Sequence, residues 1–441
     1  TGAIVLGTNT VGGLQITTTA TSNIGLGANA VDSITTGDYN IGLGDDAGTA
    51  ITSGHRNTAV GVDSMKAHTT GNNNTSLGYQ SLLADTTGAQ NVAIGKDALK
   101  TNTTAADNTA VGTQSLKLNT TGANNTAIGK QALEANTTAA NNTAVGWSAL
   151  LANTTGTSNT GVGTSALQAN TTASYSTAVG HRALMSVTTG IENTAVGYAA
   201  GDAITTGAGN VFMGLNAGTA TTTANTNVGI GYSTMVANTT GTENVAVGAT
   251  ALDANTTGIG NVAIGEAALT TATTASYNTG VGRAALRLTT TGASNTGIGF
   301  EALRANTTGA NNVAVGKNAL LVNTTAASNT AVGYFALDAN TTGAENTAVG
   351  KDSLKANTTA HNNTAYGTLS LQANTTGANN VALGGEAMYL NTTGSDNVAI
   401  GRGALDANTT AANNTAVGRN ALGANTTGAQ MTGVGYGSFD A

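Results

Sequence analysis

The chain has 441 residues, of which only 8% are charged and 3% aromatic, and its net charge is −7. Cysteine is absent, which excludes disulfides, thiolate metal sites and thiol nucleophiles. Charges are spread thinly with no basic cluster, and no apolar stretch approaches the length of a membrane span, so we expect neither a nucleic-acid partner nor a membrane-spanning chain.

The first 22 residues carry no regular pattern. Terminal segments of stacked repeats are usually atypical, because they cover the open end of the array. We therefore expect residues 1–22 to form an N-terminal cap or docking segment.

From Gly27 to Gly435 every seventeenth residue is glycine, at 25 positions without a slip in register. We number the repeat from the asparagine four residues before this glycine, which gives the consensus Asn-Thr-Ala-Val-Gly-x-x-Ala-Leu-x-Ala-Asn-Thr-Thr-Gly-Ala-Asn. A fixed period of this length predicts a solenoid, in which each coil buries its apolar side against its neighbours. The boundaries predict 24 full repeats over residues 23–430 and a partial repeat over residues 431–441.

The second to fourth places alternate large, small and large, as in Thr126, Ala127 and Ile128. This alternation and the β-branched residues predict a short strand. The ninth place is a second apolar anchor, usually leucine, and Asn-Thr-Thr-Gly follows with turn chemistry. We expect an all-β coil with one strand, a turn at glycine, a shorter strand around leucine and a second turn. The valine and leucine anchors would fill its interior.

Stacked identical coils place identical side chains in columns. First-place asparagines can hydrogen-bond along such a column, and the invariant glycines are expected to adopt a positive φ or to allow close backbone approach. The predicted structural residues are Asn57, Asn91, Asn125, Gly61, Gly95, Gly129, Gly248, Gly418 and Leu133.

So thin a coil encloses little core and should be marginal alone. We expect several chains to associate side by side, as a homotrimeric rod. The small third-place residues, such as Ala59, Ala93 and Ala110, are the predicted seam between chains.

The phrase Asn-Asn-Thr-Ala-Val-Gly followed by x-x-Ala-Leu resembles the head repeats of trimeric autotransporter adhesins. It is also similar to repeat arrays in bacteriophage tail-fibre and virion fibre proteins. The resemblance covers residues 23–441 and implies a parallel β-roll of three chains, on a virion appendage or a cell surface. The unit here is longer than the typical adhesin unit, and no stalk or chaperone-like segment is visible in the sequence.

The sixth, seventh and tenth places vary most and define the expected solvated face. Five aromatic residues in the sixth place are candidates for contact with a cell-surface glycan or protein: Trp147, Tyr79, Tyr198, Tyr232 and Tyr334. The plainer interpretation of this face is solubility. Glycine replaces the ninth-place leucine at Gly48, Gly201 and Gly218. The last two lie in adjacent repeats, in the region of Phe212 and Met213, which indicates a repacked coil or a local contact site.

No catalytic, metal or cofactor constellation is present in the sequence. The four histidines lie in four different repeats, and the paired glycines lack the context of a phosphate loop. We therefore expect a protein that is not an enzyme and has no cofactor. Asn-Thr-Thr matches the N-glycosylation sequon in many repeats, which would place a sugar on nearly every coil of a secreted eukaryotic protein.

Four functions stay open from the sequence. The first is an extracellular fibre shaft that presents a binding tip, and the second is an adhesin that binds through its variable face. The third is a self-assembling extracellular filament. The fourth is an ice-binding solenoid, in which pairs such as Thr103-Thr104 stack into columns.

Overall fold

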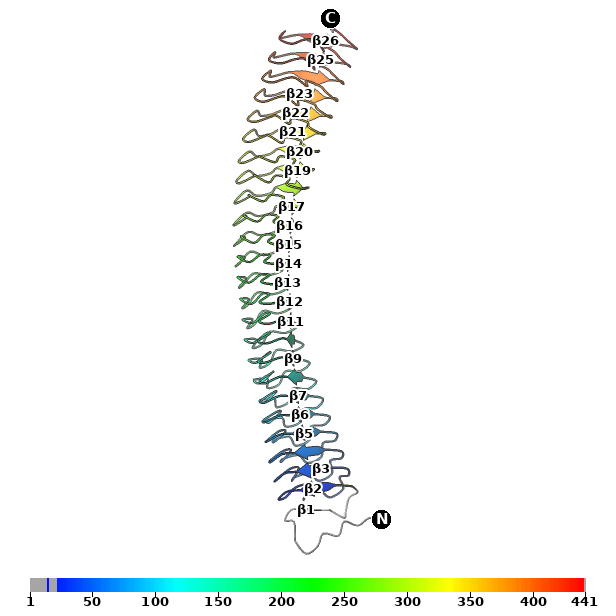
Figure 1. Ribbon diagram of the computed structural model, residues 1–441, viewed down its shortest axis with the longest axis vertical. Helices are drawn as coiled ribbons and strands as arrows, with labels where there is room; N and C mark the ends of the chain where they lie inside the picture. Colours follow the sequence, from blue (N-terminus) through cyan, green and yellow to red (C-terminus); the bar gives the residue numbers. More distant parts are fainter. Residues whose placement is uncertain (1–13, 16–21, 440–441) are drawn as a thin grey trace. The chain divides into compact units, whose positions relative to one another are not determined.

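The computed structural model describes residues 14–15 and 22–439, and it confirms the predicted all-β solenoid with one 17-residue turn per repeat and about 24 turns. The chain climbs coil upon coil, and each coil contributes one short strand (Figure 1). No helix occurs among the described residues. The chain divides into two compact units, Thr1–Asn210 and Val211–Ala441.

In the first unit, β1 (Leu14–Gln15) pairs antiparallel with β2, and the strands from β2 onward pair in parallel with their neighbours in sequence. Those strands are β2 (Ile24–Leu26), β3 (Ile41–Leu43), β4 (Thr58–Val60), β5 (Thr75–Leu77), β6 (Val92–Ile94), β7 (Thr109–Val111), β8 (Thr126–Ile128), β9 (Thr143–Val145), β10 (Thr160–Val162), β11 (Thr177–Val179) and β12 (Thr194–Val196). The rest of the predicted cap, outside Leu14–Gln15 and Ser22, lies outside the described residues.

The second unit repeats the parallel arrangement. Its strands are β13 (Val211–Met213), β14 (Val228–Ile230), β15 (Val245–Val247), β16 (Val262–Ile264), β17 (Thr279–Val281), β18 (Thr296–Ile298), β19 (Val313–Val315), β20 (Thr330–Val332), β21 (Thr347–Val349), β22 (Thr364–Tyr366), β23 (Val381–Leu383), β24 (Val398–Ile400), β25 (Thr415–Val417) and β26 (Thr432–Val434).

Within each unit, the parallel strands pair with their neighbours at an offset of one repeat, so that Thr126 lies beside Thr143, Ala127 beside Ala144 and Ile128 beside Val145. Equivalent places therefore stack in straight columns. A side-chain type that recurs at one place of the repeat therefore forms a column, with neighbouring side chains at the ~4.8 Å spacing of paired strands.

The predicted second strand around leucine is wrong, because in the described coils this segment forms turns. Leu133 has a φ of 51°, and Gln131 and Asn124 have φ values of 61° and 58°. These are left-handed conformations, which turn the chain sharply. Closing a coil in 17 residues requires such corners, and the leucine corner directs its side chain inward.

The interior also differs from the prediction. Ala127, Ala132 and Leu133 are fully buried, whereas Ile128 is 41% exposed. The third place of the strand points inward, because only small side chains fit within a single coil, and the large fourth-place residues point outward. The prediction that valine fills the core is therefore wrong. The alanine seam is also wrong, since Ala59, Ala93 and Ala110 are buried within their own chain.

Two columns of asparagine run through the interior. In the first place, Asn125 Oδ1 accepts a hydrogen bond from the backbone N of Asn142 at 3.0 Å, and its Nδ2 donates to the carbonyl of Ala139 at 2.9 Å. In the twelfth place, Asn119 Nδ2 donates to Asn102 Oδ1 and to the carbonyl of Gly122, both at 2.9 Å. The second column was not expected from the sequence. It ties the turn to the coil below, and its buried side-chain N–H groups are stable because they donate to protein acceptors, as those of Asn119 do.

A buried histidine and aspartate replace asparagine in two coils of the twelfth-place column. His68 Nδ1 lies 2.6 Å from Asp85 Oδ2, and its Nε2 lies 2.9 Å from the carbonyl oxygen of Gly71. Asn102 Nδ2 donates to Asp85 Oδ1 at 2.8 Å. Both His68 and Asp85 are fully buried. The column is thus continued by a different pair of side chains, without an unpaired polar atom on either one.

The fifth-place glycines sit where a coil leaves its strand. Gly129 has a φ of 136°, and a Cβ added there would lie 2.4 Å from the carbonyl oxygen of Gly146 in the next coil. Gly146 N also donates to the carbonyl of Ile128 at 2.8 Å. Any side chain at Gly129 would therefore both strain the backbone and separate two coils.

The irregular coil at Phe212 is a repacked one. Phe212 stands in the third place and is fully buried. A Cβ at Gly218 would lie 2.5 Å from its ring, and one at Gly229 would lie 2.8 Å from it. The ring thus occupies the space that leucine fills elsewhere. The coils of Gly48 and Gly201 instead carry a buried isoleucine in the twelfth place, Ile51 and Ile204.

Candidate interaction surfaces

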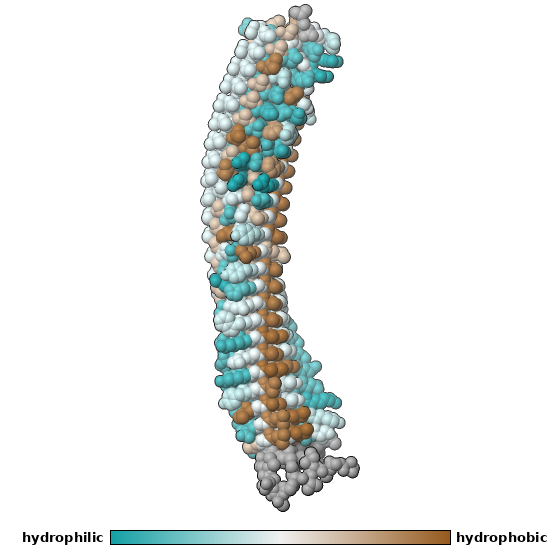
Figure 2. Space-filling model, in the orientation of Figure 1, coloured by the Kyte–Doolittle hydropathy of each residue, from teal (hydrophilic) through white to brown (hydrophobic). Residues whose placement is uncertain are grey.

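The outward face of the strands forms an apolar column in each unit. Its main component is the fourth place, where large side chains stand on the surface, including Leu77 at 46% and Ile264 at 40% exposure. Figure 2 shows these residues in brown along the line of strands drawn in Figure 1. None of the 37 Asp, Glu, Lys and Arg residues of the chain falls in the second or fourth place of any repeat. We call the second and fourth places together the strand face.

The second place adds a parallel column of threonine, valine and isoleucine. It is threonine in 15 of the 25 repeats, and Thr126 is a representative, with its side chain partly exposed beside that of Ile128. The hydroxyls of this column make no side-chain hydrogen bond within the part of the chain that the structure describes. The strand face therefore presents evenly spaced methyl groups and unpaired hydroxyls on a regular backbone.

The two threonines of each Thr-Thr pair do not form two exposed columns, as the ice-binding hypothesis requires. Thr103 Oγ1, in the thirteenth place, donates to the carbonyl of Thr120 at 3.1 Å, and this bond recurs along the array, as in Thr307 to Thr324 at 3.0 Å. The fourteenth-place threonine, such as Thr104, is exposed. Thirteenth-place hydroxyls therefore hold coils together and are not free to order water.

The twelfth-place sequon asparagines are buried. Asn119, Asn136 and Asn153 have no exposed surface, and both side-chain hydrogens of each are donated to protein acceptors. The expectation of a sugar on nearly every coil is therefore wrong for these asparagines in the folded chain, because an enzyme cannot reach an amide that lies inside the coil.

The five predicted aromatic contacts all stand on the surface, directly after the left-handed glycine. Their exposures are 48% for Tyr79, 54% for Trp147, 50% for Tyr198, 59% for Tyr232 and 43% for Tyr334. The structure does not gather them into one site. Tyr198 stacks on His181 of the preceding coil, with ring centroids 5.2 Å apart.

Tyr334 belongs to a set of neighbours that the sequence analysis did not single out. Arg283, Phe300, Lys317 and Tyr334 occupy the sixth place of four successive coils, so cations and aromatic rings alternate. The Arg283 guanidinium carbon lies 5.7 Å from the Phe300 centroid, and Lys317 Nζ lies 5.7 Å from Phe300 and 5.8 Å from Tyr334. Reading the sixth place as a column, rather than coil by coil, would have found this pattern.

Ionisable groups on the turns pair locally. Lys66 Nζ bridges Asp46 and Asp63 at 2.9 Å each. A hydrogen bond from Asn29, followed by that from Lys66, lowers the pKa of Asp46, and a hydrogen bond from Lys66 lowers the pKa of Asp63. These carboxylates in turn raise the pKa of Lys66. Exposed pairs of this kind contribute little stability.

Three tenth-place aspartates behave in the opposite way. Partial burial raises the pKa of Asp202, Asp253 and Asp338, because removing water disfavours the charged carboxylate. Arg182 partly offsets this effect at Asp202, as does Lys355 at Asp338. They lie in separate coils and form no paired-carboxylate site. Among the described residues no group of three or more His, Asp or Glu side chains is placed to hold a metal ion.

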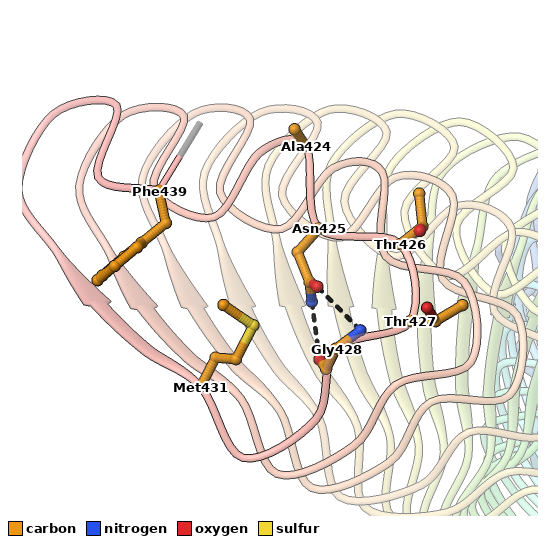
Figure 3. A pocket seen from close by; sticks show the side chains of 7 residues that line it. All are labelled: Ala424, Asn425, Thr426, Thr427, Gly428, Met431 and Phe439. Atoms are coloured by element: carbon orange, nitrogen blue, oxygen red, sulfur yellow. Dashed lines mark hydrogen bonds between the residues drawn. The ribbon is translucent and has the colours of Figure 1, made fainter. Parts of the chain in front are cut away.

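A hollow of about 320 Å³ lies in the last described coil, lined by Ala424, Asn425, Thr426, Thr427, Gly428, Met431 and Phe439 (Figure 3). Asn425 and Gly428 satisfy each other there, since Asn425 Nδ2 donates to the Gly428 carbonyl and Gly428 N donates to Asn425 Oδ1, both at 2.9 Å. Met431 stands in the first place, where asparagine closes other coils. The lining carries no ionisable side chain, so nothing in it selects a charged ligand.

Comparison with known proteins adds no family assignment. No protein-family description and no curated protein matches the sequence. The resemblance to adhesin heads and phage fibres therefore stays a prediction. In the described part of the chain, no helix has the length and apolar character needed to span a membrane.

Proposed function

We propose that the chain is the shaft of an extracellular fibre, in which three copies pack side by side through their strand faces and present a tip at a distance. The observation that carries this proposal is the strand face itself, which is regular, carries no charge and includes the apolar column of the fourth place. Exposed apolar patches of more than a few hundred Å² on soluble proteins usually mark interfaces.

The size of the strand face supports packing between chains. A three-residue strand is ~10 Å wide, and each coil adds ~4.8 Å, so the two units together offer about 1,200 Å² per chain. A stable interface buries about 800 Å² per partner. A second copy has the same coil spacing, so its fourth-place side chains can fit between those of the first along the whole of each unit.

The function that follows is mechanical. Within the coils, backbone hydrogen bonds and two asparagine columns run along the stacking direction, and packing of copies would bury the apolar column that is left over. We place this shaft on a virion appendage or a cell surface, in keeping with the resemblance of its repeats.

The test is the mass of the purified particle by light scattering, with negative-stain images. Three times the chain mass of 42.9 kDa is the expected result. Val145→Lys combined with Val162→Lys should dissociate the particle, because two charges per chain would be buried at the seam. A matched pair on the exposed fourteenth place, Thr138→Lys with Thr155→Lys, should leave the mass unchanged. A parent that is monomeric would overturn the packing proposal, and filaments of indefinite length would favour the self-assembling polymer.

Ice binding is the second candidate function. The outward strand face is a better candidate for the ice-binding surface than the Thr-Thr pairs are. Thr126 and Ile128 point to the same side of one strand, and both columns repeat at the coil spacing. Free hydroxyls and methyl groups on a flat lattice are suited to ordering water. This function requires an uncovered face, so thermal hysteresis is expected only from a monomer, and a trimer without hysteresis would end this candidate.

A further inference from the structure

In the second unit, the turn that follows each strand carries a pattern of cationic and aromatic side chains. The shaft proposal does not account for this pattern. Residues 283–355 contain six Lys and Arg against four Asp and Glu, in a chain whose net charge is −7. Within this stretch, five consecutive coils place Arg283, Phe300, Lys317, Tyr334 and Lys351 in the sixth place, and all five side chains are exposed. We call these five residues the alternating column.

Lys317 is the centre of the alternating column. Its ammonium lies between two rings, 5.7 Å from the centroid of Phe300 and 5.8 Å from that of Tyr334. Among the described residues no carboxylate lies within ion-pair distance of Lys317. The outer cations differ, since Arg283 is 3.3 Å from Glu266 and Lys351 is 3.4 Å from Asp352. The column therefore leaves one exposed positive charge without a counter-ion, flanked by two aromatic rings.

The aromatic surfaces are extended at one end. Tyr334 contacts Phe335 edge to face, with centroids 4.2 Å apart, and Lys355 Nζ lies 4.8 Å from the Phe335 ring. Rings held by neighbours are already ordered, so a ligand that packs against them costs less side-chain entropy on binding.

We propose that the alternating column binds a linear polysaccharide in which an acidic sugar alternates with a neutral one. The column runs along the stacking direction, so its ligand must also be linear. Successive coils are ~4.8 Å apart, which is similar to the length of one pyranose ring, so that sugars and coils keep step. The acidic sugar would lie opposite Lys317, and its neutral neighbours would pack against the exposed edges of Phe300 and Tyr334.

Other polymers fit this spacing less well. An extended peptide advances by ~3.3 Å per residue and loses register with the coils within a few residues. Single-stranded nucleic acid carries a phosphate at every nucleotide and binds along continuously basic grooves, whereas the cations here occur only at every second coil. Because cations alternate with uncharged rings in the column, we expect a ligand in which anionic units alternate with uncharged ones.

The experiment measures binding of a fluorescent hyaluronan decasaccharide to the full-length chain by polarisation, at low and at high salt. Hyaluronan alternates a uronic acid with a neutral amino sugar and is the probe for that pattern. We expect saturable binding that weakens with salt. Lys317→Met should weaken it about tenfold, and Phe300→Leu should weaken it similarly, while Lys130→Met, in the same place beside Trp147, should leave it unchanged.

Several outcomes would overturn the proposal. They are absence of hyaluronan binding, equal binding by Lys317→Met, equal binding of a neutral chitin oligosaccharide, and tighter binding of an oligothymidylate. Particle mass by light scattering is measured on the same samples. Because the alternating column lies on the turns and not on the strand face, failure of glycan binding and failure of side-by-side packing are separate results.

Discussion

The repacked coil at Phe212 gives the sharpest test of how this core is filled. Phe212→Ala removes a fully buried ring and should cost about 3–5 kcal/mol, because nothing else fills the space. Gly218→Leu alone should also be destabilising, by about 3 kcal/mol or more, since a Cβ at that position already meets the ring at 2.5 Å. Each change by itself breaks the fit between a large third place and an empty ninth place.

The double variant Phe212→Ala with Gly218→Leu restores the consensus of the other coils, in which Ala246 and Leu252 are both buried. Gly218 has a φ of 65°, close to the 54° of Leu252, so leucine can adopt this backbone. We expect stability within about 1.5 kcal/mol of the parent, and hence a favourable coupling of several kcal/mol.

Urea unfolding followed by circular dichroism measures the four proteins, and hydrogen exchange at the amide of Gly218 localises the effect, since this N–H donates to the carbonyl of Thr234. Exchange is needed because long repeat arrays do not always unfold in one step. Additive losses in the double variant would refute the idea that the ring and the leucine occupy the same space.

Three further predictions concern the repeat itself. Gly129→Ala should cost about 3 kcal/mol or more, from a φ that only glycine tolerates and from the clash with the next coil, whereas Ala127→Gly should cost about 1.5 kcal/mol; equal urea midpoints would contradict this order. Asn119→Ala should cost about 2–4 kcal/mol, because it leaves buried acceptors unpaired, while the exposed Asn124→Ala should cost only about 1 kcal/mol in thermal unfolding, from alanine at a φ of 58°. Asp253→Asn should stabilise the chain at neutral pH. Because the pKa of Asp253 is raised in the folded chain, the parent regains stability as pH falls from that pKa toward 3.8. The stability advantage of the variant should therefore shrink on acidification. A constant difference in unfolding free energy between parent and variant from pH 7 to 4 would argue against burial as the cause.

Period and alternation were enough to predict the solenoid, its coil length and its strands, because a 17-residue repeat with large-small-large triplets has few other solutions. They could not show which side of the strand faces inward. In a sheet the larger residues usually face the core, but a coil this narrow admits Ala127 and excludes Ile128. Local patterns do not carry that constraint, since it arises only when the coil closes.

The twelfth-place asparagine was missed for a related reason. Asn-Thr-Thr-Gly reads as an exposed turn, and only the closed coil shows that the Asn119 amide turns inward to meet Asn102. The exposure of the five candidate aromatic residues could be predicted, because they occupy a variable place of the repeat. The alternating column depended on cations in the neighbouring coils, which are distant in sequence and adjacent in space.

The buried pair His68 and Asp85 has a consequence for how the chain finds its alignment. In an array of equivalent coils, a strand that skips one coil meets the same side chains as before, so the mistake changes the energy little and the looped-out coil is not corrected. His68 ends that degeneracy, because a skipped coil would place it against Asn102 and leave Asp85 without its partner. A single unlike pair thus gives a periodic chain a fixed origin from which its coils can be counted.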